Sequence, residues 1–238
     1  MYDCQVAQPD DLESTTQPAA PAAETGLSRA QVVAEAIRLA DADGVEGLSM
    51  RKLATSLGAG AMSLYHYVAN KSELLDAMAD VVFAEIDAPE GDDWRAAMRR
   101  RSISARAVLA RHPWAVGVLE SRVSPGPETL RHREAVMACL RRAGFSPVMA
   151  THANWLLDSY VYGFALQEAS LPFTSADDLA DMTEAVYLPQ LPQDRFPYLH
   201  ESAAALMEAG FDPAEQFVFG LELILEALEP LRSETATG

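Results

Sequence analysis

The sequence predicts an all-α protein, with an N-terminal helix-turn-helix unit of three helices and a larger helical C-terminal domain. Apolar residues recur at the i, i+3, i+4, i+7 spacing of one helix face in successive segments. Capping residues precede these segments, and glycine or proline follows them. No stretch of useful length alternates as a strand does. A hydrophobic share of 49% over 238 residues is enough for a sizeable core.

The first helix is expected to begin after residue 28. Residues 1–27 hold no lysine or arginine and no sustained apolar period, which predicts a disordered acidic tail. Ser28 and Gln31 then form a capping box, and Gly44 ends the segment. Its single apolar stripe consists of Val33, Ala36, Ile37 and Ala40.

The stretch from Ser49 to Lys71 is typical of two short helices joined by a turn at Gly58-Ala59-Gly60. Ser49 is a helix cap. We expect two buried stripes that pack together, Met50, Leu53, Ala54 and Leu57 in the first helix and Ala61, Leu64, Tyr65 and Val68 in the second. The outer surface would then hold groups suited to phosphates and base edges, namely Met62, Ser63, His66 and Tyr67 beside Arg51 and Lys52. We interpret this as a DNA-binding helix-turn-helix, and an ordinary helical hairpin is the alternative.

A longer helix should follow, capped by Asn70 with Glu73 at its third position and ended by Pro89 and Gly91. Its apolar side consists of Leu75, Met78, Ala79, Val82 and Ile86. The predicted boundaries are therefore residues 28–72 for the helix-turn-helix domain and 73–91 for a connecting helix.

Residues 92–230 are predicted to be helical throughout, with breaks at His112-Pro113, residues 124–127, 144–147 and 189–197. The segment 147–169 is apolar on most sides, and so is the last helix, which Asp212 caps. Two such helices from each of two chains would form a four-helix homodimer interface. Residues 231–238 are expected to be a tail.

Charge and composition narrow the class of protein. The net charge is −17, yet residues 28–71 hold five basic and four acidic residues, a balance of +1, which leaves −18 for the rest. The candidate DNA-binding segment is thus the non-acidic part of the chain. Cys4 and Cys139 lie in unrelated contexts, and no signal or 18-residue apolar segment is present, so we expect a cytoplasmic protein with no membrane partner.

Candidate chemistry is sparse. The five histidines form no metal-ligand spacing, and neither a nucleophile motif nor a phosphate loop occurs, so we expect no catalytic residues, no metal and no cofactor. The run Arg99-Arg100-Arg101 is interpreted as surface salt-bridge partners. The rival hypothesis is a helical-bundle enzyme or small-molecule carrier with a merely structural helix-turn-helix.

The run LSMRKLATSLGAGAMSLYHYVANKSELLDAM, with its pattern L-G-x-x-x-x-S-L-Y-x-Y-V-x-N-K, resembles the TetR family of bacterial transcription regulators. GDDW at 91–94, AGF at 143–145 and FVFGLELILEALE at 217–229 are similar to its tetracycline-repressor branch. The resemblance implies a homodimeric repressor that a small-molecule inducer, whose identity stays open, releases from a palindromic double-stranded DNA operator; an activator is the alternative.

The resemblance also implies site residues. The DNA-binding positions are Arg51, Ala61, Met62, Ser63, Tyr65, His66, Tyr67 and Lys71. Ala61 departs from the longer polar residue that often stands there, which shifts direct base contacts to Met62, Ser63 and Arg51.

For the inducer, the resemblance implies a mostly apolar pocket lined by Arg101, Ala105, Val136, Leu140, Asn154, Trp155, Asp158 and Tyr162. Trp155 and Tyr162 are equally consistent with core aromatics. The family's metal-binding histidine falls near Leu119 or Glu120, so a magnesium-tetracycline inducer is not expected. The alternative is a constitutive DNA-binding protein with no inducer, which would be favoured if residues 92–230 held no cavity of about 300 Å³.

Overall fold

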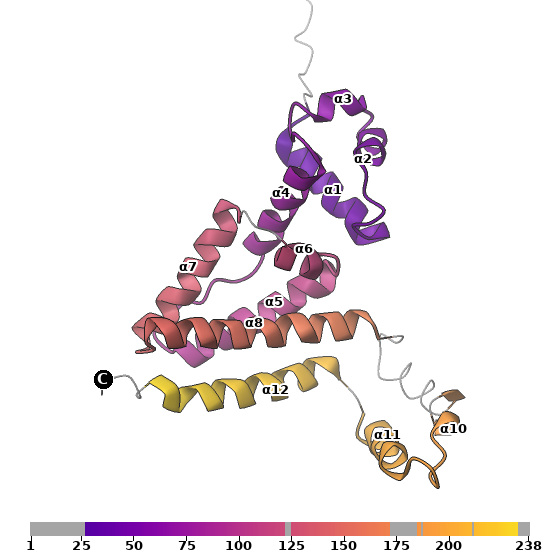
Figure 1. Cartoon of the computed structure of the whole chain (residues 1–238), viewed down its shortest axis with the longest axis vertical. Helices are drawn as coiled ribbons and strands as arrows, with labels where there is room; N and C mark the ends of the chain where they lie inside the picture. The colour runs from indigo at the N-terminus through magenta and orange to yellow at the C-terminus, as the bar shows by residue number, and fades with distance from the viewer. Residues whose placement is uncertain (1–26, 122–124, 172–184, 187, 211, 233–238) are drawn as a thin grey trace, which may run out of the picture.

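The computed structural model describes residues 27–121, 125–171, 185–186, 188–210 and 212–232, and the side chains of residues 119–121 are not described. All regular structure in these ranges is helical, as predicted (Figure 1). The N-terminal unit consists of α1 (Arg29–Asp43), α2 (Met50–Ser56), α3 (Ala61–Leu64) and α4 (Lys71–Ala84). The C-terminal unit consists of α5 (Trp94–Arg111), α6 (Ala115–Ser121), α7 (Pro127–Arg142), α8 (Pro147–Ala169), α10 (Leu188–Gln190), α11 (Pro197–Ala209), α12 (Pro213–Leu228) and the 3-10 helix η2 (Glu229–Arg232).

The caps of the N-terminal unit form as predicted. Ser28 Oγ accepts the backbone N–H of Gln31 at 3.2 Å, and Gln31 Oε1 accepts that of Ser28 at 2.8 Å. Ser49 Oγ accepts the N–H of Lys52 at 3.2 Å. Gly58 has a φ of +63°, the left-handed conformation that lets the chain turn sharply between α2 and α3.

The buried side of the second short helix differs from the prediction. Leu64 and Val68 are buried, but Ala61 is exposed, Tyr65 is 45% exposed, and Tyr67 is the tyrosine that packs partly against the core. The reason is that α3 ends at Leu64 and residues 65–67 form a turn, so the 100° step of a helix does not continue to Tyr65 and Tyr67. The prediction that Tyr65 is buried and that Tyr67 lies on the outer surface is therefore wrong.

Helix α4 joins the two units. Asn70 Oδ1 accepts the N–H of Glu73 at 2.9 Å, as predicted for its cap. The helix is buried on more sides than the single predicted stripe, because it packs against α1 on one side and against α6 and α7 on the other. Leu74, Ala77 and Phe83 are buried in addition to Met78, Ala79 and Val82. Since α4 begins at Lys71, residues 71 and 72 already belong to it.

In the C-terminal unit, α5 crosses α7 and α8, and α12 packs along α5 and α8 (Figure 1). Helix α8 spans Pro147–Ala169, the range that the sequence predicts, and α12 begins after its Asp212 cap. Helix η2 continues the fold past residue 230, since Arg232 Nε donates to the carbonyl of Ala143 at 2.8 Å. The predicted acidic tail, apart from residue 27, and residues 233–238 lie outside the described residues.

Candidate DNA-binding surface and ligand pocket

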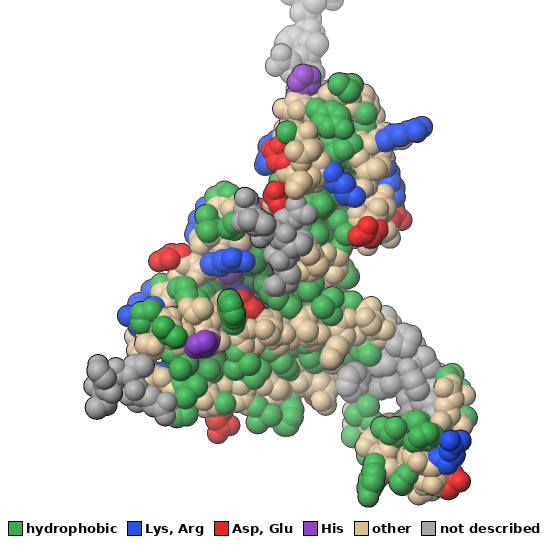
Figure 2. Space-filling model, viewed as in Figure 1, with side chains coloured by type: hydrophobic (Ala, Val, Ile, Leu, Met, Phe, Trp, Pro, Cys, Tyr) green, Lys and Arg blue, Asp and Glu red, His purple; other side chains and the backbone are tan. Residues whose placement is uncertain are grey.

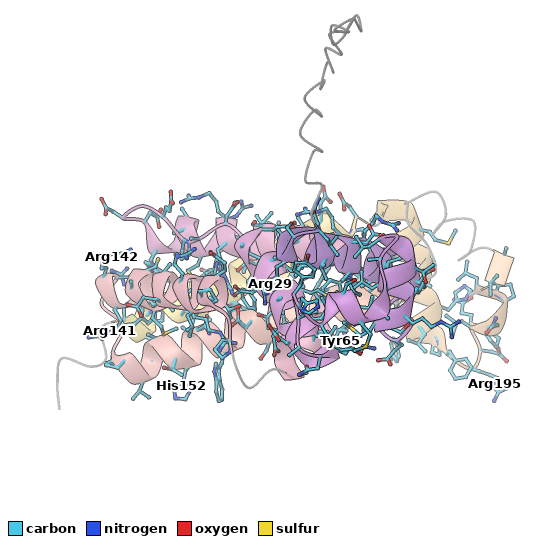
Figure 3. All side chains as sticks on the ribbon, turned by 90° about the horizontal axis from the view of Figure 1, so that it is seen from above. Arg29, Tyr65, Arg141, Arg142, His152 and Arg195 are labelled. Atoms are coloured by element: carbon cyan, nitrogen blue, oxygen red, sulfur yellow. The ribbon has the colours of Figure 1, made fainter. Side chains whose placement is uncertain are left out.

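The predicted DNA-binding residues gather on the far end of the N-terminal unit, where α2, α3 and the following turn meet. Met62 is 77% exposed, and Tyr65, Arg51, Ala61 and His66 are also exposed. Figure 3 looks down on this unit and shows Tyr65 on it, away from His152, Arg141 and Arg142 of the C-terminal unit. The surface thus presents a thioether, an aromatic ring, an imidazole and a guanidinium outward.

Three of the predicted DNA-binding residues are less exposed. Ser63 is half-buried and donates its hydroxyl to the carbonyl of Gly60 at 2.6 Å, which leaves its lone pairs as acceptors. Tyr67 is half-buried against the core. Lys71 is half-buried, with Nζ 3.5 Å from the carbonyl oxygen of Val45. A phosphate contact from Tyr67 or Lys71 therefore stays a prediction from the resemblance.

Ion pairs compensate some of the positive charge on this unit. Arg38 binds Glu35 at 2.6 Å, and Lys52 binds Asp43 at 2.6 Å. The Arg38 and Ser56 hydrogen bonds lower the pKa of Glu35 to about 2. Figure 2 nevertheless shows lysine and arginine side chains projecting from this unit. Arg51, in the first turn of α2, is exposed.

A pocket of about 730 Å³ lies among α6, α7 and α8, well above the 300 Å³ expected of a ligand site. Four of the eight predicted inducer residues line it: Asn154, Trp155, Asp158 and Tyr162. Trp155 is 69% exposed at the pocket, so its alternative role as a core aromatic is wrong. Asn154 Nδ2 donates to Asp158 Oδ2 at 3.0 Å, which holds two polar groups side by side on the wall.

The other four predicted residues, Arg101, Ala105, Val136 and Leu140, are buried and do not line the pocket. Arg101 is 2% exposed, and its Nη2 lies 2.7 Å from Asp158 Oδ1. Its Nε donates to Nε2 of His132 at 3.2 Å. A buried cation on α5 is therefore held between a carboxylate on α8 and an imidazole on α7, behind the pocket wall.

Within this group, Arg101 Nη1 and the hydroxyl of Ser102 are buried and have no hydrogen-bond partner among the described residues. Asp158 Oδ1 is close to Arg101 without good hydrogen-bond geometry. Burial, together with the Arg101 charge, lowers the pKa of His132 to about 4, so its Nε2 is an unprotonated acceptor at neutral pH.

The prediction missed six lining residues, which are Val116, Arg133, Met137, Thr151, Ser159 and Leu166. Three of them could have been predicted from spacing alone, because Thr151, Ser159 and Leu166 lie three or four residues from Trp155 or Tyr162 on α8. Val116, Arg133 and Met137 come from α6 and α7, and only the packing of these helices brings them to the pocket.

The sequence predicts that the arginine run forms surface salt bridges, and this is confirmed for Arg99 alone, because Arg100 bonds a backbone carbonyl. Arg99 Nε bonds Glu222 Oε1 of α12 at 2.5 Å, and Arg100 donates to the carbonyl of Glu90 at 2.6 Å. Arg101 also departs from the prediction, since it is buried. A run of three arginines in the sequence does not show which of them is buried, because consecutive side chains on a helix point about 100° apart.

Within the described ranges, no group of three or more histidine, cysteine, aspartate or glutamate side chains is placed to hold a metal ion. No helix in the described part of the chain has the length and apolarity needed to cross a membrane. The positions near Leu119 and Glu120, which bear on a metal-bound inducer, have side chains outside those described.

Comparison with known proteins identifies both units. Residues 32–78 match the family described as bacterial regulatory proteins, tetR family, and residues 87–232 match the tetracyclin repressor-like C-terminal domain. The chain is 37% identical to the HTH-type transcriptional repressor DrrR1 of Streptomyces coeruleorubidus, over 86% of this chain and 78% of that protein. It is 29% identical to the class C tetracycline repressor of Escherichia coli, over 88% and 94% of the two chains.

Among solved structures, apo ActR from Streptomyces coelicolor is similar with a TM-score of 0.72 and 32% identity, covering 88% of this chain and 98% of that one. ActR in complex with actinorhodin is similar with a TM-score of 0.71 and 32% identity, covering 87% and 99%. These likenesses cover most of the chain.

The low pKa of His132 makes stability depend on pH. The folded state keeps this side chain neutral down to about pH 4, whereas the unfolded chain takes up a proton near the ordinary histidine pKa of 6.5. The contribution is therefore complete above pH 6.5 and is lost as the pH falls toward 4, with a slope of at most about 1.4 kcal/mol per pH unit. We expect urea unfolding between pH 7.5 and 5 to show this decline.

The variant His132→Phe should show a shallower pH dependence than the parent, although it is less stable at every pH because Arg101 loses an acceptor. The exposed His152→Gln serves as the matched control and should keep the parental slope. If stability depended equally on pH in the parent and in His132→Phe, folding would not lower the pKa of His132.

Proposed function

We propose that this chain, which belongs to the tetR family of bacterial regulatory proteins and is a ligand-responsive DNA-binding repressor, binds its operator as a homodimer through α2, α3 and the turn after α3. The observation that carries the proposal is the exposed cluster around Met62 and Tyr65 on a helix-turn-helix of this family. The chain is a regulator rather than an enzyme. Since it acts on DNA, we infer that it works in the cytoplasm.

DNA recognition would combine two kinds of contact. Tyr65, His66 and Lys71 are suited to phosphates, which position the protein without reading sequence. Met62 can contact thymine methyl groups, and Arg51 can bond guanine, whereas Ala61 offers only a methyl. Recognition by this surface therefore rests on methyl contacts, Arg51 and DNA shape.

The homodimer would form along α8 and α12. These helices are held together by the stacked rings of Tyr160 and Phe217, 5.3 Å apart, and Gly220 leaves room for the Tyr160 ring. Their outward sides carry exposed apolar residues, with Phe219 at 65% and Leu223 at 54% on α12 and Leu156 at 46% on α8. Figure 2 shows hydrophobic side chains along this edge of the molecule. A second copy of the chain would bury them and place two α3 helices in successive major grooves, about 34 to 36 Å apart.

The inducer would bind in the pocket among α6, α7 and α8. Trp155 and Tyr162 offer aromatic faces, and Asn154, Asp158 and Arg133 offer hydrogen bonds and charge, a lining suited to a planar polycyclic compound with hydroxyl or acid groups. ActR, a structural relative, has been crystallised with actinorhodin and with (S)-DNPA. We infer an inducer of this chemical class.

The DNA proposal is tested by retaining genomic fragments on the immobilised protein. Tyr65→Ala should lower the affinity for a recovered fragment at least about tenfold, because a hydrogen bond to phosphate and the packing of the ring are both lost. Tyr198→Ala, which removes another exposed tyrosine from α11, should bind like the parent. Equal retention by the parent and Tyr65→Ala would contradict this assignment of the surface.

The dimer is tested by light scattering during size exclusion. Leu223→Glu should yield a monomer, because a carboxylate would be buried without a partner in the interface. Leu130→Glu is the matched control, since Leu130 on α7 is also 54% exposed, and it should keep the parental mass. A dimeric Leu223→Glu protein would place the interface elsewhere.

The inducer class is tested with actinorhodin as the probe. Saturable quenching of tryptophan fluorescence should accompany release of bound DNA, and Trp155→Phe should lose most of the quenching, since Trp155 is the tryptophan that lines the pocket. If the parent shows no saturable change, planar polycyclic compounds of this kind are not the inducer class.

A further inference from the structure

Asp41 on α1 connects the N-terminal unit to the junction of α5 and α6. Its Oδ1 accepts the indole N–H of Trp114 at 2.7 Å and lies 2.8 Å from Nδ1 of His112. His112 and Trp114 are 7% and 8% exposed, whereas the Asp41 side chain keeps 30% of its surface exposed, so the contact lies at the edge of the core. His112 also turns Nε2 toward Glu85, at the end of α4, at 3.4 Å. One imidazole therefore touches carboxylates from both long helices of the N-terminal unit.

Asp80 on α4 makes a second connection, to the first turn of α7. Its Oδ1 accepts the backbone N–H of Thr129 at 2.8 Å and the hydroxyl of Thr129 at 3.0 Å, and its Oδ2 accepts the N–H of Glu128 at 3.3 Å. The residue preceding α7, Gly126, has no side chain that could cap the helix. An aspartate from another helix thus satisfies N–H groups that a helix leaves unpaired at its start.

Gly126 is required for this connection. A Cβ at residue 126 would lie 2.3 Å from the carboxyl carbon of Asp80, which is far below contact distance. The backbone there has a φ of −74°, so strain is not the reason for glycine. An alanine at this position would instead displace the Asp80 carboxylate.

Both connections end on helices that line the inducer pocket. Trp114 directly precedes α6, whose Val116 lines the pocket, and Thr129 lies one turn before Arg133 on α7, which lines it as well. A compound that separates α6 from α7 would therefore shift the partners of Asp41 and Asp80 together. Short polar bonds are directional and weaken steeply when their geometry changes, so small displacements of α6 or α7 would break them.

We propose that Asp41 and Asp80 are positioning residues that set the angle of the N-terminal unit against α6 and α7. This inference rests on the proposed repressor function. Neither aspartate lies at the DNA-binding surface or in the pocket. In the unliganded dimer, the two bonds would hold the two α3 helices at operator spacing, and their loss would leave each unit able to bind DNA but not both at once.

The first test measures the angle without DNA or inducer. Spin labels at Thr55→Cys and Arg142→Cys, in a Cys4→Ser background diluted with unlabelled protein, report the distance between the two units of one chain. The parent should give one narrow distribution. The double variant Asp41→Ala/Asp80→Ala and the single variant Gly126→Ala should widen it at least about twofold, because the N-terminal unit samples more orientations.

Matched controls separate this effect from general loosening. Asp194→Ala and Gly117→Ala should keep the parental width, since Asp194 is exposed and nothing lies within 4 Å of a Cβ at Gly117. Asp80→Asn should also keep it, because an asparagine oxygen still accepts the N–H of Thr129. Circular dichroism establishes that each variant is folded. Parental widths in both the double variant and Gly126→Ala would overturn the proposal.

The second test compares a full palindromic fragment with a half-site duplex. The double variant should bind the full site about tenfold more weakly than the parent and the half-site equally well, whereas Tyr65→Ala should weaken both. Equal affinity of parent and double variant for the full site would overturn the proposal. Absence of DNA binding by the parent would overturn the repressor function instead, and the distance measurement would still decide the role of the two aspartates.

Discussion

The buried charge of Arg101 constrains how three helices of the C-terminal unit pack together. A guanidinium that is 2% exposed must be paired, because removing one partner of a buried ion pair costs about 3–5 kcal/mol. Its partners are Asp158 on α8 and His132 on α7, so one cation sets the relative placement of three helices. The low pKa of His132 follows from the same burial, and it keeps this imidazole an acceptor rather than a second positive charge.

The buried charge of Arg101 lies directly behind the wall of the pocket. Asp158 belongs both to the ion pair and to the wall of the pocket, so an occupant that bonds this carboxylate competes with Arg101. His132 lies one turn from Thr129, which Asp80 of α4 holds, and its ring packs against Phe83 of α4 at 5.8 Å. The pocket, the buried pair and α4 thus form a continuous set of contacts, along which a change at the pocket can reach the N-terminal unit.

The net charge of the chain is divided unevenly between the helix-turn-helix segment and the remaining residues. Residues 28–71 carry a net charge of +1 and the rest −18, so non-specific attraction to DNA is weak outside the helix-turn-helix. A repressor of this composition depends on its helix-turn-helix rather than on a broad basic face.

The sequence by itself determined the helices and the family. Caps and stops act within three or four residues, so Ser28, Ser49, Asn70 and Asp212 predicted helix starts that the structure confirms. The ends of α8 follow from equally local signals. The motif after Ser49 was specific enough to indicate a repressor of this family, which the comparisons confirm.

Only the tertiary structure decided which side chains meet. Because α3 ends at Leu64, Tyr65 is exposed and Tyr67 packs against the core, the reverse of the prediction. The predicted spacing assumes that the helix continues through both tyrosines, whereas a turn interrupts it. The burial of Arg101 and the contacts of Asp41 and Asp80 join residues 31 to 73 positions apart. Such pairs depend on the angles at which helices pack, and spacing along one helix contains no information about the next.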